Sequence, residues 1–210
     1  MRYYGVAVAL LIAAVLAVPA TGLATERVVV YGQSMPLTHL DSAYGAYLTY
    51  PAGYEAAFVI YEGLVGFDAN MNIQPLLATG WEVSEDGKTW IFHLRKGVKF
   101  HDGTPFNAQA VVVNVIRGMD PKRTTTNRMH WEHWESVEAL DEYTVKLVSK
   151  YPNAMTLASL AHGAGLIASP AAIEKYHDDL GTHPVGTGPY KLEKFDVGRE
   201  LVLVAFEDYW

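Results

Sequence analysis

The sequence predicts a mixed α/β or α+β fold, in which strands and helices alternate along the chain. β-branched and alternating segments predict strands, capped apolar segments predict helices, and Gly, Pro and Asp-Gly turns separate them throughout. Half of the 210 residues are hydrophobic and 12% are aromatic. This composition is typical of a chain that folds around a core, and not of a disordered one.

The N-terminus has the pattern of a secretory signal peptide, which we predict for residues 1–24. Arg2 supplies a positive start, Val6–Val18 is an unbroken apolar run, and Gly22–Ala24 offers small residues for cleavage. The run is shorter than the roughly 20 residues of a bilayer span, which argues against a membrane anchor. The chain has no cysteine, which argues against disulfides and a lipoprotein cysteine. We therefore expect a periplasmic protein, secreted through its signal peptide.

The chain is acidic. Its formal net charge is −7, and removal of the signal peptide makes it one unit more negative because Arg2 is lost. This balance argues against a nucleic-acid partner, which a basic surface would favour. It does not predict the charge of a small solute, because a binding site is local and the net charge is global.

The first half of the mature chain predicts a strand, a helix and hairpins. The clearest hairpin has the Asp-Gly signal of a tight turn in Glu85–Lys88 between two alternating segments. Pro51 is suited to the first turn of a helix. The predicted elements are a strand at Arg27–Tyr31, a turn at Pro36–Asp41, a helix at Pro51–Leu64, a hairpin of residues 65–67 and 72–73, and a hairpin of residues 81–84 and 89–94.

The second half predicts three helices, two of them capped, and further strands. Asn107 and Ser169 are good N-caps for the apolar segments that follow them, and Pro121 closes the first of these helices. The predicted elements are a turn at His101–Pro105, a helix from Asn107 to Met119, a loop over residues 120–135, strands at Ser136–Ala139 and Tyr143–Ser149, helices at Ala154–His162 and Ser169–Tyr176, a strand from Tyr190, and a strand at Glu200–Phe206.

One long segment, Ile60 to Val112, reads IYEGLVGFDANMNIQPLLATGWEVSEDGKTWIFHLRKGVKFHDGTPFNAQAVV. It is followed by VEALDEYTVKL, PNA, IASPAAIEKY, GTHPVGTGPYKLEKF and EDYW. Together these segments resemble, in the same order, the family 5 extracellular solute-binding proteins of bacterial ABC importers. No single segment is decisive, but their common order makes coincidence implausible.

The resemblance implies an α/β fold of the type II periplasmic binding proteins, whose two lobes close around a solute. It also implies a small α+β domain inserted in the first lobe. We expect the main domain to begin in residues 25–61, the insertion to span 62–168, and the main domain to resume in 169–210. Family members are much longer than one ordinary domain, so we expect the second lobe to be missing. A fragment is the leading interpretation, and a natural stand-alone domain is the alternative.

The same resemblance implies ligand contacts in loops that face the hinge. The first such loop follows the first strand, and the alternative is a surface loop with one packed tyrosine. Arg128 suits a bidentate carboxylate contact, as first-lobe arginines make in nickel-chelate members; a solvated loop is the alternative. Glycine beside His162 would let the backbone approach a ligand closely. The candidate ligand-binding residues are Asp41, Ser42, Ala43, Tyr44, Arg128, His130, Trp131, His162 and Gly163.

No cofactor, metal site or catalytic residue is expected. The histidines show no His-Glu-x-x-His spacing. The Gly186–Gly188 turn lacks the helix and the Gly-Lys-Ser/Thr sequence of a phosphate-binding loop, and Gly32–Pro36 lacks the second glycine of a nucleophile elbow. We therefore expect a binding protein and not an enzyme.

The resemblance predicts a monomeric receptor that captures a peptide or similar small solute and delivers it to an ABC permease in the inner membrane. The alternative ligand is a nickel or other metal chelate. The choice stays open because, in peptide-binding relatives, the charged groups that hold the peptide termini come mainly from the second lobe. For the same reason we expect residues 25–210 alone to bind weakly or not at all.

Overall fold

A computed structural model describes residues 36–43, 51–122 and 128–210 of the chain. Within them the predicted mixture of helices and antiparallel strands is confirmed. The predicted signal peptide and the predicted strand at Arg27–Tyr31 lie outside the described residues. None of the helices in the described ranges has the length and apolarity needed to cross a bilayer.

Residues from the middle of the chain form a four-stranded antiparallel sheet. It consists of β3 (Ala78–Val83), β4 (Thr89–Leu94), β5 (Trp134–Asp141) and β6 (Thr144–Ser149), in the order β3-β4-β6-β5. The Asp-Gly hairpin predicted between β3 and β4 is confirmed, and Gly87 has the positive φ of 68° that its turn requires. The predicted pair of later strands is confirmed as β5 and β6.

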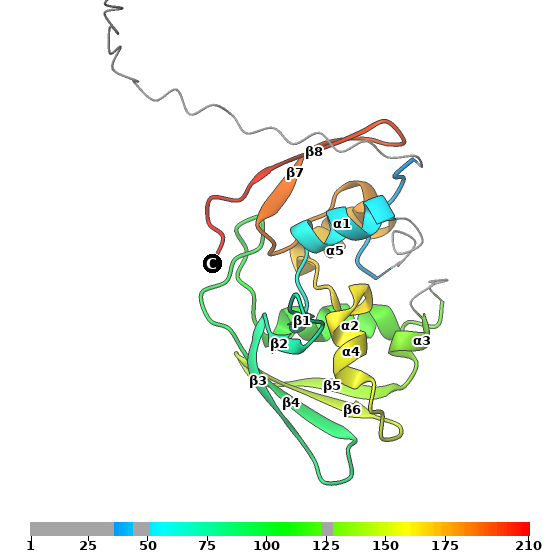
Figure 1. The fold of residues 1–210 in the computed structure, drawn as a ribbon, viewed down its shortest axis with the longest axis vertical. Coiled ribbons are helices and arrows are strands. Elements are labelled where there is room, and N and C mark those ends of the chain that lie inside the picture. The colour runs from blue at the N-terminus through cyan, green and yellow to red at the C-terminus, as the bar shows by residue number, and fades with distance from the viewer. Residues whose placement is uncertain (1–35, 44–50, 123–127) are drawn as a thin grey trace, which may run out of the picture. The chain divides into compact units, whose positions relative to one another are not determined.

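The helix α2 (Ala108–Met119) covers one face of this sheet (Figure 1). Its predicted cap is confirmed, because the side chain of Asn107 accepts a hydrogen bond from the Ala110 N–H at 3.1 Å. Apolar side chains of α2 and the sheet form the first core. Its buried members include Leu77, Phe92, Leu94, Phe100, Phe106, Val111, Val115, Trp134, Val145 and Leu147.

A second core lies among α1 (Pro51–Ile60), α5 (Pro170–Tyr176) and the hairpin of β7 (Tyr190–Asp196) and β8 (Glu200–Ala205), which Figure 1 shows close together. Ser169 caps α5 as predicted, since its Oγ accepts from the Ala172 N–H at 3.3 Å. The buried members of the second core are Leu40, Ala57, Ile60, Tyr61, Leu166, Ala168, Ala172 and Leu180.

Shorter elements complete the described chain. They are β1 (Val65–Phe67), β2 (Ile73–Pro75), α3 (Arg128–Trp131), α4 (Thr156–Ala161), and the 3-10 helices η2 (Gly163–Gly165) and η3 (His177–Thr182).

Two predicted boundaries are wrong. The helix predicted to reach Leu64 ends at Ile60, because Glu62 pairs with Ile167 and its carbonyl accepts the Ile167 N–H at 2.9 Å. The predicted loop at 120–135 contains α3 and the first residues of β5, which pair with β6. In both places a tertiary contact overrides the local pattern.

Gly186 packs its backbone against the C-terminal end of α1. A β-carbon there would overlap the carbonyl oxygen of Ile60 and lie 2.7 Å from the ring of Tyr61. We expect Gly186→Ala to lower the free energy of unfolding by about 1–3 kcal/mol, as overpacked sites do. Urea denaturation measures this loss. Gly80→Ala is the matched control, because nothing lies within 4 Å of its β-carbon position, and an equal loss in both variants would contradict the prediction.

Candidate functional site

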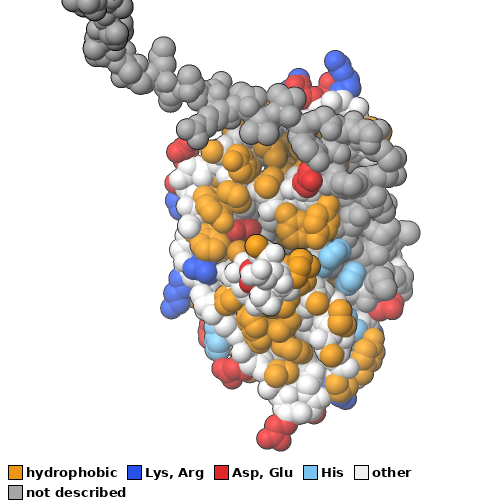
Figure 2. All heavy atoms as spheres, in the orientation of Figure 1, with side chains coloured by type: hydrophobic (Ala, Val, Ile, Leu, Met, Phe, Trp, Pro, Cys, Tyr) orange, Lys and Arg blue, Asp and Glu red, His pale blue; other side chains and the backbone are white. Residues whose placement is uncertain are grey.

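Four rings from three parts of the chain meet in one group, called here the imidazole–aromatic group: Tyr54, Phe58, His130 and His162. The ring centroids of Tyr54 and Phe58 are 4.5 Å apart, and those of Tyr54 and His162 are 5.6 Å apart. The rings of His130 and His162 stack with centroids 5.9 Å apart and planes 22° apart. Figure 2 shows histidine side chains at the surface beside hydrophobic ones.

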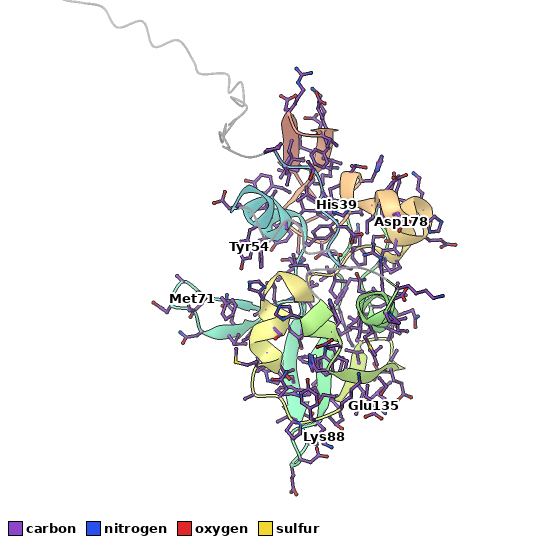
Figure 3. The ribbon with its side chains drawn as sticks, turned by 90° about the vertical axis from the view of Figure 1, so that its right-hand side faces the viewer. His39, Tyr54, Met71, Lys88, Glu135 and Asp178 are labelled. Atoms are coloured by element: carbon purple, nitrogen blue, oxygen red, sulfur yellow. The ribbon has the colours of Figure 1, made fainter. Side chains whose placement is uncertain are left out.

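Local sequence positions each of these rings. Tyr54 and Phe58 lie one turn apart on α1, which places them on the same face of the helix, and Figure 3 shows where Tyr54 projects from it. His162 ends α4, where its N–H donates to the Ala158 carbonyl at 3.1 Å. The tight turn that follows requires glycine, because a β-carbon on Gly165 would overlap the Leu160 carbonyl. His130 is supplied by α3.

The group is uncharged near neutral pH. Partial burial lowers the pKa of both histidines, and the neighbouring His162 lowers the pKa of His130 further. Burial also raises the pKa of the Tyr54 hydroxyl. Since desolvation penalises the charged form in each case, the group presents two neutral imidazoles and a neutral phenol.

One nitrogen of the group lacks a hydrogen-bond partner in the described part of the chain. The Nδ1 atom of His162 is buried and has no hydrogen-bond partner among the described residues. A buried polar atom without a partner costs free energy, and a bound solute that hydrogen-bonds to it would remove that cost. The ring faces beside it can stack on planar groups. The group is therefore suited to bind a polar solute by hydrogen bonding and stacking.

The described residues do not form a complete metal site. His130 and His162 are two neutral ring donors, whereas zinc sites use three or four protein ligands. No set of three potential metal-ligating His, Cys, Asp or Glu side chains comes together in the described ranges.

The predicted loop after the first strand lies elsewhere and is largely buried. Asp41, Ser42 and Ala43 are 1%, 1% and 6% exposed. Both carboxylate oxygens of Asp41 accept hydrogen bonds from Arg117 of α2, and the Oδ1–Nη1 distance is 2.6 Å. This part of the loop forms a buried ion pair with α2. Tyr44, the fourth candidate of that loop, lies outside the described residues.

The other candidates occupy different positions. Trp131 is 3% exposed and belongs to the first core, where its ring packs closely against Gly118. A hollow of about 250 Å³ beside it is also lined by Trp134 and Lys150. Arg128 is the first residue of α3, and Gly163 is buried next to His162 in η2. Of the predicted candidates, the structure thus brings together His130, His162 and the adjacent Gly163.

Sequence reasoning missed Tyr54, Phe58 and Arg117. The first two had a usable signal, because two aromatic residues four apart in a predicted helix share a face. Arg117 had none: its partner Asp41 is 76 positions away, and α2 looked like an ordinary amphipathic helix.

Comparison with known proteins gives consistent matches. The family model of the bacterial extracellular solute-binding proteins, family 5 Middle, matches residues 72–210. The glutathione-binding protein GsiB of Escherichia coli O1:K1 / APEC is 41% identical over 150 residues, which are 71% of this chain and 29% of GsiB. The chain therefore spans less than a third of the length of this curated relative.

Solved structures of the same kind also match. DppA from Helicobacter pylori, an ABC transporter-associated periplasmic binding protein in complex with the peptide STSA, matches with a TM-score of 0.75 and 30% identity. The match covers 85% of this chain and 39% of DppA. NikZ from Campylobacter jejuni, in complex with Ni(L-His), matches with a TM-score of 0.74 and 28% identity over 82% of this chain and 34% of NikZ.

Proposed function

Because the chain belongs to family 5 of the bacterial extracellular solute-binding proteins, we propose that it is part of a periplasmic receptor for an ABC permease. The receptor captures a peptide or similar small solute and passes it to the membrane without converting it. GsiB is named for binding glutathione and DppA holds a short peptide, and both support this solute class. A monomer with an N-terminal signal peptide at residues 1–24 is the form we propose.

The two cores support a division of the chain into the proposed domains. Residues 25–61 and 169–210 would form the main domain of the first lobe, which contains most of the second core. Residues 62–168 would form the inserted domain, which contains the first core and ends with Leu166 and Ala168 of the second core. The proposed boundaries at 61/62 and 168/169 fall where the chain passes between the cores, next to the paired residues Glu62 and Ile167.

The imidazole–aromatic group is the proposed contribution of the described residues to solute binding. The observation that carries this proposal is the buried, unpartnered Nδ1 atom of His162 beside stacked rings. We propose that this atom hydrogen-bonds to the solute and that Tyr54 and His130 pack against it. Tyr44 and Arg128 stay candidates on the family resemblance alone.

Calorimetric titration of the full-length gene product with glutathione and with short peptides tests the proposal. We expect binding by the wild type and a loss of affinity of about tenfold in His162→Ala, which corresponds to one hydrogen bond of about 1.4 kcal/mol. A saturating solute should also raise the melting temperature, because it binds only the folded state.

His93→Ala is the matched control. This histidine lies on β4, where its ring nitrogen is 2.9 Å from Glu82 and its side chain is 48% exposed. It takes no part in the ring contacts that define the imidazole–aromatic group. The His93→Ala variant should bind the solute with the same affinity as the wild type. Equal affinities for His162→Ala and the wild type would remove His162 from the site, and the absence of binding by any solute tested would overturn the receptor proposal.

A metal chelate is the second candidate solute. His130 and His162 are two neutral imidazoles whose ring centroids are 5.9 Å apart. Such rings are suitable ligands for a metal that brings its other ligands with it, and NikZ holds Ni(L-His). Titration with nickel and L-histidine together, compared with glutathione, discriminates between the two. Tight binding of the nickel complex that is lost in both His130→Ala and His162→Ala would favour the chelate.

A further inference from the structure

His101 connects a turn of the first core to the Gly186–Gly188 turn near the second core. Its backbone N–H donates to the Gly186 carbonyl at 2.9 Å. Its Nε2 lies 2.9 Å from the Gly188 carbonyl oxygen, and its Nδ1 lies 3.3 Å from the Gly186 nitrogen. These contacts of His101 with Gly186 and Gly188 are called here the His101 clamp.

The clamp fits one protonation state of the ring. A carbonyl oxygen only accepts hydrogen bonds, so Nε2 must carry a proton to bind Gly188. The Gly186 N–H only donates, so Nδ1 must be without a proton to accept it. Both contacts are therefore made by the neutral tautomer with hydrogen on Nε2. A protonated ring would point an N–H at the Gly186 N–H, and that hydrogen bond would be lost.

The clamp lies between the two cores. Phe100, next to His101, is a buried member of the first core. On the other side, the Gly188 N–H donates to the carbonyl of Ile60 in the second core at 2.9 Å. A parallel link lies next to it, where the Ser169 hydroxyl at the start of α5 donates to Asp102 at 2.5 Å.

The charged groups around the ring have opposing effects on it. Burial lowers the pKa of His101 most, the hydrogen bond to Gly188 raises it, Lys191 of β7 lowers it and Asp102 raises it. The ring of Phe206 meets the His101 imidazole edge-on, with the ring centroids 4.9 Å apart. Glu62 accepts a hydrogen bond from Thr187, between the two clamped glycines, at 2.8 Å.

We propose that His101 is a proton-sensitive clamp that holds the Gly186–Gly188 turn, and with it the joint between the two cores, at neutral pH and releases it in acid. The sign follows from linkage: the folded state favours the neutral ring. The stabilisation is therefore complete at pH values above the ordinary histidine pKa of about 6.5. It is lost as the pH falls toward the lower pKa that His101 has in the folded state. The device does not depend on which solute the protein binds.

Hydrogen exchange at pH 7.5 and pH 5.5 tests the clamp. After correction for the intrinsic pH dependence of exchange, the protection of amides in residues 98–106 and 183–190 should fall by up to about tenfold at the lower pH, the ratio that a histidine of ordinary pKa in the open state produces. In His101→Gln, whose amide does not titrate in this range, that pH-dependent loss should disappear. His93→Gln is the matched control and should keep it.

A second measurement does not require a variant. Long-range proton–nitrogen NMR spectra of the wild type should show the His101 ring with hydrogen on Nε2 and with a pKa below the ordinary histidine value of about 6.5. A His101 ring that titrates at the ordinary value, or a His101→Gln variant that folds and loses protection in acid as the wild type does, would overturn the proposal.

Discussion

Arg117→Ala is expected to lower the free energy of unfolding by roughly 3–5 kcal/mol, the loss seen when one partner of a buried ion pair is removed. The side chains of Arg117 and Asp41 are 5% and 2% exposed. Without the guanidinium, the Asp41 carboxylate would stay buried without this counter-charge, although the Ala43 N–H would still donate to it at 3.0 Å. Urea denaturation followed by tryptophan fluorescence measures the loss.

An exposed ion pair supplies the control. Arg199 contacts Asp196 at 3.2 Å, and its side chain is 82% exposed, so Arg199→Ala should cost at most about 1 kcal/mol. The double variant Asp41→Leu/Arg117→Met should lose less free energy of unfolding than Arg117→Ala, because it leaves neither charge of this pair in the interior. If Arg117→Ala loses no more than Arg199→Ala, the ion pair does not stabilise the fold as argued.

Asn114→Ala is expected to lower the free energy of unfolding by about 2–4 kcal/mol. The Asn114 amide donates to the Ala168 carbonyl at 2.8 Å and accepts from the Ala168 N–H at 2.9 Å. Ala168 is fully buried, so both of its backbone groups would lose their partner away from water. Thermal and urea unfolding measure the change.

Two variants make this prediction specific. Asn114→Asp should lose still more free energy of unfolding at pH 7. The carbonyls of Ala168 and Ala110 both accept hydrogen bonds from the Asn114 amide, and a carboxylate cannot donate to them. Asn70→Ala, at an exposed turn position, should change stability by no more than about 0.5 kcal/mol. Equal effects at Asn70 and Asn114 would contradict the role of the buried amide.

These two sites and the His101 clamp have a common position in the molecule. Asn114 binds the chain where it enters the second core, Arg117 binds the loop that carries Leu40 of that core, and His101 binds the turn that packs on α1. The contacts between the two cores thus include buried polar groups with specific geometry. In a binding protein whose lobes move, such contacts would keep the first lobe rigid while the hinge absorbs the motion.

Local rules were sufficient for much of the fold. The β3–β4 hairpin follows from an Asp-Gly turn between alternating segments, and the starts of α2 and α5 follow from caps that bind an N–H three residues ahead. The family follows from segments in a common order, and the matching family model shows it. In each case the interacting groups are close in sequence, so their pattern is visible before the chain folds.

The imidazole–aromatic group and the contacts between the cores could not be predicted in this way. Asp41 and Arg117 are 76 positions apart, Asn114 and Ala168 are 54 apart, and His101 and Gly188 are 87 apart. None of these residues has an unusual local pattern, and even His130 and His162, both candidates from the sequence, could not be paired before the structure placed their rings together. The sequence by itself therefore determined the family, most of the elements and their caps. Only the tertiary structure decided which polar side chains are buried against one another, because burial removes water as a partner and makes the pairing of distant groups obligatory.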